Sequence, residues 1–397
     1  MNIPIDLKAV FQEAMDVDAA RSVPLVVSVL LDETAPADLV AFVRSSFASA
    51  SPQARISISY FTDGGAAFDP QSDMAVIAAG LTEDVGLIAR RVREASIPAL
   101  VVTTLPEIVS KRAIASGHPI PEGDLVAPVV QDGDILSFPE SVVISSEATY
   151  EEPSMYRDQL DDPITLEPYA LNEHFAHQLS CRMGEWVVAC FRTKRLAFAQ
   201  AFDFVRRPLS MESIRSTAAQ NAGVGLVAFI PGADLPIMTL NQAKMVLQIA
   251  AAYGQPLTLE RAKELAAVVG GGFACRGAAR QLVGVLPALG WAIKAGIGYA
   301  GTSAMGHAAI EYFERGGKGA GVAAVAAKAR EAVIDAAEKT NAGHAVKETA
   351  RELGRQAVHA IKYMAQSTIR DNRESNACAA STTAATAAGA TGDSCKG

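Results

Sequence analysis

Three acidic side chains, Asp32, Glu33 and Asp38, follow the first long apolar run of the chain, where a nucleotide-binding α/β protein carries its phosphate loop. That loop has the pattern GxxxxGK[ST], which provides backbone N–H groups for phosphates, a lysine, and a hydroxyl ligand for magnesium. The segment here reads LLDETAPADLV, without glycine or lysine, and TLPE (residues 104–107) stands where a guanine-reading NKxD would follow the fourth strand. Because site chemistry outweighs fold analogy, the sequence disfavours GTP hydrolysis and predicts no cofactor and no catalytic residue.

Two glycine motifs match a dinucleotide-binding fingerprint in their letters only. Gly296–Gly301 reads GIGYAG, and Gly223–Ala228 reads GVGLVA. Neither follows a convincing strand, and the fingerprint needs a strand before it and a helix after it. Close helix packing is the better explanation of the first motif, because small side chains recur every four residues around it. The members of this stripe are Ala288, Ala292, Gly296, Ala300 and Ala304.

The sequence gives little evidence for a metal site or for reactive cysteines. His174 and His177 lie three residues apart beside Glu173, a spacing that can bind a metal, but no third ligand is evident, so we predict a solvated helix face and no metal. The five cysteines form no CxxC, and their odd number argues for reduced thiols in a cytoplasmic compartment. No GxSxG occurs either.

Short β-branched runs alternate with helical patterns in the first quarter of the chain. Strands are predicted over residues 24–31, 55–61, 74–79 and 99–104, and helices over residues 37–47 and 83–96, the second with Thr82 as its cap. Alternation of this kind predicts a doubly wound, mostly parallel α/β sheet, similar to that of GTPases but without their phosphate loop.

The amino-acid composition changes at residue 117. Prolines interrupt residues 117–172, and between Glu122 and Glu173 there are 13 acidic residues and one base, Arg157. This stretch predicts a solvated linker with one strand at residues 141–145. After it we expect an all-α, Gly/Ala-rich region whose helices cover residues 171–204, 211–229 (capped by Ser210), 239–253, 259–269, 287–313 and 322–369.

The predicted organisation is therefore a G-like domain over residues 1–145, a linker over 146–170, a helical domain over 171–370 and a low-complexity, disordered tail over 371–397.

The distribution of charge separates the two halves. Residues 1–219 carry 17 basic and 30 acidic side chains, a net charge of −13, and residues 220–397 carry 18 basic and 13 acidic, a net charge of +5. The total of −8 disfavours nucleic acid as a partner. The apolar half is thus also the cationic half, which suits a surface near anionic lipid, although solvated helix faces explain it equally well.

Two apolar stretches raise the question of a membrane. Residues 222–240 and 281–310 exceed the roughly 20 residues that span a bilayer. However, Pro231 and Gly232 interrupt the first stretch, and Lys294 lies within the second, where a charge is costly in lipid. A buried helical core that docks on a membrane is favoured over a true span.

Residues 211–314 resemble the helical domain of domain-of-unknown-function family 697, a YcjF-type domain that is often encoded beside or fused to GTPases. The resemblance rests on the run from Asn221 through PGADLP, the segment YG, and VLPALGWAIKAGIGYAGTSAMGHAAIEYF. It implies an all-α module, often membrane-associated, with no assigned catalysis. The matching positions, whose role is unknown, are Pro231, Gly232, Asp234, Gln242, Tyr253, Gly254, Arg276, Arg280, Pro287, Gly290, Thr302 and Gly306.

Several of these positions have a structural interpretation: Pro231 and Gly232 make a turn, Asp234 caps the next helix, and Gly254 ends one.

The function that fits these observations is a non-catalytic interaction or scaffold protein at the cytoplasmic face of the membrane. The alternatives are a divergent NTPase and a regulator of a partner GTPase. The sequence leaves open membrane lipids, a partner GTPase or other protein, and a second copy of the chain as partners.

Overall fold

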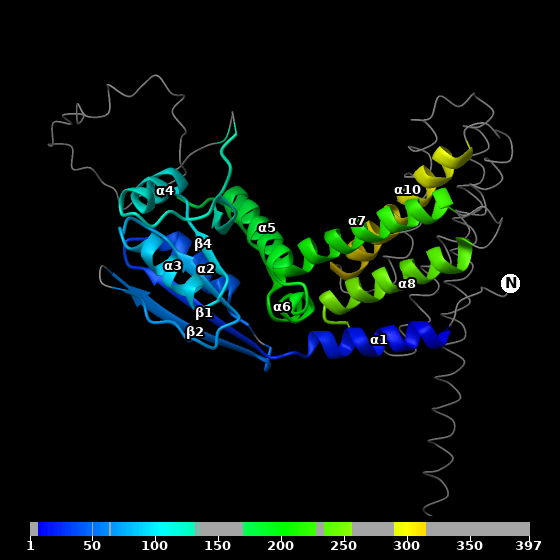
Figure 1. Cartoon of the computed structure of the whole chain (residues 1–397), viewed down its shortest axis with the longest axis horizontal. Helices are drawn as coiled ribbons and strands as arrows, with labels where there is room; N and C mark the ends of the chain where they lie inside the picture. The colour runs from blue at the N-terminus through cyan, green and yellow to red at the C-terminus, as the bar shows by residue number, and fades with distance from the viewer. Residues whose placement is uncertain are drawn as a thin grey trace, which may run out of the picture. The chain divides into compact units, whose positions relative to one another are not determined.

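The computed structural model describes residues 7–49, 51–62, 65–131, 134, 170–227, 234–255 and 290–314 (Figure 1). The chain divides into two compact units, one of residues 19–209 and one of residues 1–18 with residues 210–397. The boundary between Leu209 and Ser210 falls inside a single helix, α7 (Asp203–Val227).

The first unit contains a sheet of five parallel strands in the order β2-β1-β3-β4-β5. The strands are β1 (Leu25–Asp32), β2 (Ala54–Phe61), β3 (Met74–Ala78), β4 (Ala99–Val102) and β5 (Leu125–Val126). This is the order of flavodoxin-like doubly wound folds. The chain goes outward from β1 to β2 and then returns to β3 on the other side of β1, so the topological switch point lies between β1 and β3.

Helices cover both faces of this sheet. They are α2 (Ala37–Ser46), α3 (Val85–Glu94), α4 (Pro106–Ala115), α5 (Glu173–Cys190) and α6 (Arg195–Ala201), with a short 3₁₀ helix, η1 (Glu122–Asp124). Helices α3 and α4 form a core with one set of strand residues, which includes Leu30, Ile77 and Val101. Successive strand residues point to opposite faces, and their buried neighbours, such as Val76, lie on the face that α2 and α5 contact.

Polar contacts and aromatic packing hold α5 and α6 to the sheet. The indole of Trp186 donates to the Asp124 carboxylate (3.4 Å), and the Arg182 guanidinium donates to the Ala127 carbonyl. The Lys194 ammonium forms an ion pair of 2.6 Å with Asp73, just before β3. The rings of Phe202 and Phe204, just after α6, pack edge to face on Phe47, at the end of α2. Residues 173–201 therefore belong to the α/β unit.

Three helices form the described core of the second unit: α7, α8 (Asp234–Ala252) and α10 (Gly290–Glu314). Their shared apolar cluster includes Ile214, Met245, Ile249, Met305 and Phe313. Helix α1 (Leu7–Arg21) precedes the sheet in the chain and crosses the boundary between the units.

The predicted fold class, a doubly wound parallel sheet followed by a helical region, is confirmed. Some details differ. The Thr82 hydroxyl donates to Asp32 and does not cap α3, which begins at Val85. Ser210 is not a cap either, because α7 begins at Asp203 and continues through Pro208.

Proline is tolerated inside α7 because of its neighbour on α5. Pro208 has no N–H, so the Phe204 carbonyl loses its helical donor. That carbonyl lies against Gly184, where an added Cβ atom would be only 2.4 Å away. The close approach of the two helices therefore uses the irregular turn that the proline creates.

The two glycine motifs lie inside helices. GIGYAG lies within α10, and the described part of GVGLVA lies within α7, so neither has the strand that a dinucleotide fingerprint requires. A bilayer crossing needs about 20 apolar residues in succession, and no helix in the described ranges meets that requirement. The predicted strand at 141–145, the helices at 259–269 and 322–369, and the tail lie outside the described residues.

Two glycines of α10 give a matched test of its packing. An added Cβ atom at Gly306 would lie 2.2 Å from the side chain of Ile214, which is buried, whereas at Gly301 it would have no atom of the described residues within 4 Å. Gly306→Ala is expected to destabilise the helical unit by about 1–3 kcal/mol through overpacking. Gly301→Ala should stabilise it by about 0.5–1 kcal/mol, since alanine favours the helix. Urea unfolding of both variants measures the difference, and equal effects would contradict the packing described.

Candidate functional site

The crevice at the carboxyl ends of β1 and β3 is where an open α/β sheet normally binds its ligand. Asp32, the last residue of β1, is fully buried there. Its Oδ1 atom accepts hydrogen bonds from the Thr34 N–H (2.8 Å), the Thr34 hydroxyl (2.7 Å) and the Thr82 hydroxyl (2.6 Å). Its Oδ2 atom accepts from the Gly80 N–H (2.8 Å) and the Thr82 N–H (3.3 Å). Loop N–H groups of the kind that cradle a phosphate thus bind a carboxylate of the chain itself.

The backbone closes the same crevice. A Cβ atom at Gly80 would lie 2.3 Å from the Ala35 nitrogen and 2.4 Å from the Thr34 carbonyl carbon. Only glycine permits this approach of the loop after β3 to the loop after β1. The two loops that would have to part around a ligand are therefore packed on one another.

The other acidic side chains of LLDETAPADLV do not converge on the crevice. Glu33 is exposed. The Asp38 carboxylate accepts from the Leu39 N–H (2.8 Å) and the Leu171 N–H (2.5 Å), so it joins the start of α2 to the segment before α5. The three acidic residues that the sequence grouped together have separate roles, and only Asp32 lies at the switch point.

The helical unit contains a second polar centre, in which Thr302 of α10 has the central position. The Thr302 hydroxyl accepts from the side-chain amides of Asn221 (3.0 Å) and Gln242 (2.9 Å), and all three residues are buried. The Asn221 carbonyl oxygen in turn accepts from the Asn241 amide (3.0 Å). Hydrogen bonds between side chains thus connect α7, α8 and α10 inside an apolar core. Such a network fixes how helices pack, because a shifted helix would leave amides unpaired.

The structure brings together only some of the predicted family positions. Gln242 and Thr302 are in direct contact. The Tyr253 hydroxyl donates to Glu314 at the end of α10 (2.9 Å), and Gly254 ends α8 with φ of +68°. Glycine adopts this left-handed conformation without strain, and the conformation allows the hydrogen bonds of a Schellman motif after Ala252. The prediction that Gly254 ends a helix is therefore confirmed.

The remaining positions fall at helix starts, at a helix contact, or outside the described ranges. Asp234 and Gly290 are the first residues of α8 and α10, and Gly306 makes the close contact with Ile214. Five positions lie outside the described residues: Pro231, Gly232, Arg276, Arg280 and Pro287. Sequence reasoning gave Asn221 no role. The sequence feature that could have identified Asn221 is a row of polar residues at helical spacing. These residues lie on the buried side of α7: Ser210, Ser213, Thr217 and Asn221.

The two histidines of α5 do not converge on one point. The His174 Nε2 atom lies 2.7 Å from the Gln178 amide nitrogen and 3.8 Å from Asp134, whereas the His177 Nε2 atom lies 3.8 Å from the Cys181 sulfur. Within the described ranges no cluster of three or more metal-ligating side chains occurs.

The thiols of α5 are poor nucleophiles. Burial raises the pKa of the Cys181 thiol, Glu185 adds to the rise, and Arg207 opposes it. Burial also raises the pKa of Cys190, with a further contribution from Asp124. Because the thiolate is the reactive form, both residues should react with iodoacetamide more slowly than free cysteine near neutral pH, and the rate should still be rising above about pH 9. Peptide-resolved mass spectrometry measures both rates, and thiols faster than free cysteine would contradict this electrostatic description.

Comparison with known families gives a match for residues 192–374. Residues 192–374 match the model of a family described as "Domain of unknown function (DUF697)". The match includes the polar centre of Asn221, Gln242 and Thr302 and extends beyond the predicted range of residues 211–314 at both ends. No curated protein and no solved structure matches the chain. Residues 192–374 are therefore similar to the DUF697 family, and residues 19–209, which overlap the start of this match, form an α/β unit with a parallel, doubly wound sheet.

Proposed function

We propose that this protein is a non-catalytic interaction protein whose α/β unit serves as a scaffold and not as a nucleotide switch. The observation that carries the proposal is the buried Asp32 carboxylate, which accepts five hydrogen bonds at the switch point. A phosphate group in the same place would have to replace the Asp32 carboxylate as the acceptor of these hydrogen bonds. It would also be repelled at short range by the negative charge of that carboxylate. In a site of low polarity that repulsion is large.

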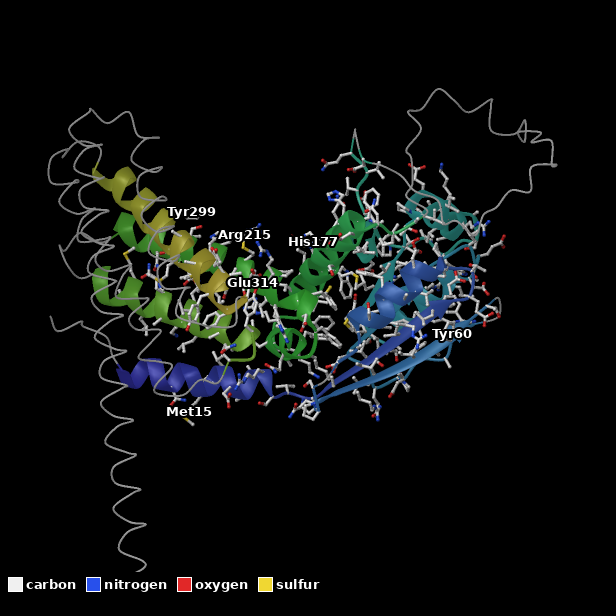
Figure 2. All side chains as sticks on the ribbon, turned by 180° about the vertical axis from the view of Figure 1, so that it is seen from behind. Met15, Tyr60, His177, Arg215, Tyr299 and Glu314 are labelled. Carbon is white, nitrogen blue, oxygen red and sulfur yellow. The ribbon has the colours of Figure 1, made fainter. Side chains whose placement is uncertain are left out.

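The edge strand β2 is a surface suited to protein contact. Within the described ranges β2 pairs with β1 only, and the side chains of Ile58 and Tyr60 are 47% and 51% exposed (Figure 2 labels Tyr60). An open edge with exposed apolar residues favours pairing with another strand. A second copy of the chain fits this edge, because antiparallel pairing centred on Ile58 places Ile56 opposite Tyr60 and Ile58 opposite itself.

Light scattering after gel filtration tests this part of the proposal. The wild-type chain is expected to form a dimer, and Ile58→Lys should make it monomeric by placing two like charges opposite each other. Val129→Lys is the matched control, since Val129 is equally exposed but lies outside β2. A monomeric wild-type protein, or a dimer that Ile58→Lys leaves intact, would exclude β2 as the contact.

Location at the cytoplasmic face of a membrane is the second part of the proposal. Its support is the net charge of +5 on residues 220–397 beside the −13 of residues 1–219. A cationic region is attracted to anionic lipid, and salt weakens that attraction. The full chain should float with phosphatidylglycerol vesicles at low salt and less so at high salt, but not with phosphatidylcholine vesicles. If the chain floats with neither kind of vesicle, the membrane part of the proposal is refuted and the scaffold part is unaffected.

A further inference from the structure

A pocket lies at the opposite end of the sheet from Asp32. It has a volume of about 820 Å³ and lies between the end of α2, the loop that leads into β2, helix α5 and the first turns of α7. That loop enters β2 at its amino end, whereas the crevice of Asp32 is at the carboxyl ends of the strands. The volume is within the range of about 300–1,000 Å³ that small-molecule sites occupy. Everything that lines the pocket belongs to the α/β unit.

The wall formed by α7 is cationic. Arg206 is held by the Ala199 carbonyl, which accepts from its Nε atom (3.2 Å), and by the Asp203 carboxylate at 2.8 Å. Arg207 is next to it and lies close enough to Cys181, across the pocket on α5, to lower the pKa of that thiol. Among the described residues that line the pocket, the guanidinium groups are those of Arg206 and Arg207 and the carboxylate is that of Asp203. Guanidinium groups match the geometry of phosphate oxygens and remain charged at all physiological pH values.

The remaining lining is both polar and apolar. His177 and Ser180 of α5 and Ser46 of α2 provide groups that can hydrogen-bond a ligand (Figure 2 labels His177), and the ring of Phe204 provides an apolar surface. Small-molecule sites combine an apolar lining with a few polar groups that fix orientation.

Gln200 is a lining residue with one unsatisfied polar atom in the described part of the chain. The Gln200 Oε1 atom is buried and accepts no hydrogen bond from the described part of the chain. Leaving such an acceptor unsatisfied is unfavourable, and an exception of this kind needs an explanation. A ligand with a hydroxyl or N–H donor would satisfy it once the Gln200 side chain turns toward the pocket.

From these observations we infer that the pocket is a binding site for a phosphate ester with hydroxyl groups, in which Arg206 and Arg207 bind the phosphate and Gln200, after turning its amide toward the pocket, accepts from a hydroxyl. This goes beyond the proposed scaffold function, since it gives the protein a ligand of its own. A free sugar or polyol phosphate and the headgroup of a phospholipid share this chemistry. The raised pKa of Cys181 is consistent with binding without covalent attachment.

The experiment uses the two cysteines of α5 as internal probes. Cys181 lines the pocket and Cys190 does not. The full chain is labelled with iodoacetamide in the presence of glycerol 3-phosphate, or of glycerol with sodium chloride at the same ionic strength, and each peptide is quantified by mass spectrometry. Glycerol 3-phosphate should slow labelling of Cys181 and leave Cys190 unchanged, and glycerol with salt should slow neither.

Matched variants test the assigned residues. Arg207→Gln should raise the concentration of glycerol 3-phosphate needed for half protection by about tenfold, through loss of a charge-assisted contact. Arg192→Gln removes an exposed arginine outside the pocket and should have no effect. The same labelling with phosphatidylglycerol vesicles distinguishes the sources, because protection by vesicles alone identifies a lipid headgroup and protection by the soluble ester identifies a free ligand.

The inference is overturned if neither the ester nor the vesicles protect Cys181 selectively, or if Arg207→Gln and Arg192→Gln behave alike. It is also overturned if glycerol and salt protect as well as the ester. These outcomes leave the scaffold proposal untouched, since that proposal rests on Asp32 and on the edge strand β2, which do not line the pocket.

Discussion

Replacement of Asp32 by alanine is expected to destabilise the α/β unit by about 3–5 kcal/mol, the largest effect of any single substitution considered. The carboxylate is fully buried and accepts from the N–H groups of Thr34, Gly80 and Thr82 and from both threonine hydroxyls. Alanine would leave these donors without their acceptor in a crevice that Gly80 closes tightly. Glu33→Ala is the matched control, because Glu33 is the adjacent exposed carboxylate and should change stability by less than about 0.5 kcal/mol.

The two tryptophans allow each unit to be followed separately. Trp186 lies in α5 of the α/β unit and Trp291 lies in α10 of the helical unit. In a Trp291→Phe background, Trp186 fluorescence during urea unfolding should show the Asp32→Ala transition at much lower urea than that of the parent. An Asp32→Ala transition that coincides with that of Glu33→Ala would mean that the hydrogen bonds of Asp32 contribute little.

Thr302→Val is expected to destabilise the helical unit by about 2–4 kcal/mol, the second largest effect. Valine has nearly the same shape, so the packing around Thr302 is preserved. The hydroxyl, however, is the shared acceptor of the Asn221 and Gln242 amides, and its loss removes this acceptor from both buried amides, of which the Asn221 amide keeps a weaker contact of 3.5 Å with the Met238 carbonyl. Trp291 fluorescence in a Trp186→Phe background reports on this unit.

Ser303→Ala provides the control for Thr302→Val on the same helix. Ser303 is half-buried, and its hydroxyl lies 3.4 Å from the His307 ring nitrogen, one turn along α10. Its replacement should cost less than about 1 kcal/mol. If Thr302→Val is as mild as Ser303→Ala, the polar centre does not determine how the three helices pack.

Strong local patterns made much of the α/β unit predictable. The runs that became β1 and β3 are apolar and rich in β-branched residues because both faces of a doubly wound sheet are covered. Strand β5 has two residues, too few for any periodicity, and it was not predicted. Helix α4 also has only a short pattern, and the start of α7 was placed after Pro208 because the sequence does not show that Gly184 accommodates the turn.

The sites were less predictable than the elements. The sequence shows that LLDETAPADLV does not have the pattern of a phosphate loop, but it does not distinguish its three acidic residues from one another. Only the structure distinguishes Asp32 from Asp38. Asp32 accepts hydrogen bonds from loop N–H groups, and Asp38 joins α2 to the segment before α5. The local pattern of residues does not show contacts between distant positions, such as those of Thr302 with Gln242 and Asn221, which are 60 and 81 positions away.

Calorimetric melting of the full chain with GTP or ATP and magnesium tests the central claim, that the switch-point crevice is filled by the chain's own carboxylate. A ligand that binds the native state must raise its stability, by about 2.7 kcal/mol at a concentration one hundred times the Kd. We predict no change in melting temperature with either nucleotide. A saturable rise with GTP or ATP, reduced when Thr34 or Thr82 is replaced by valine, would contradict the claim and favour the alternative of a divergent NTPase.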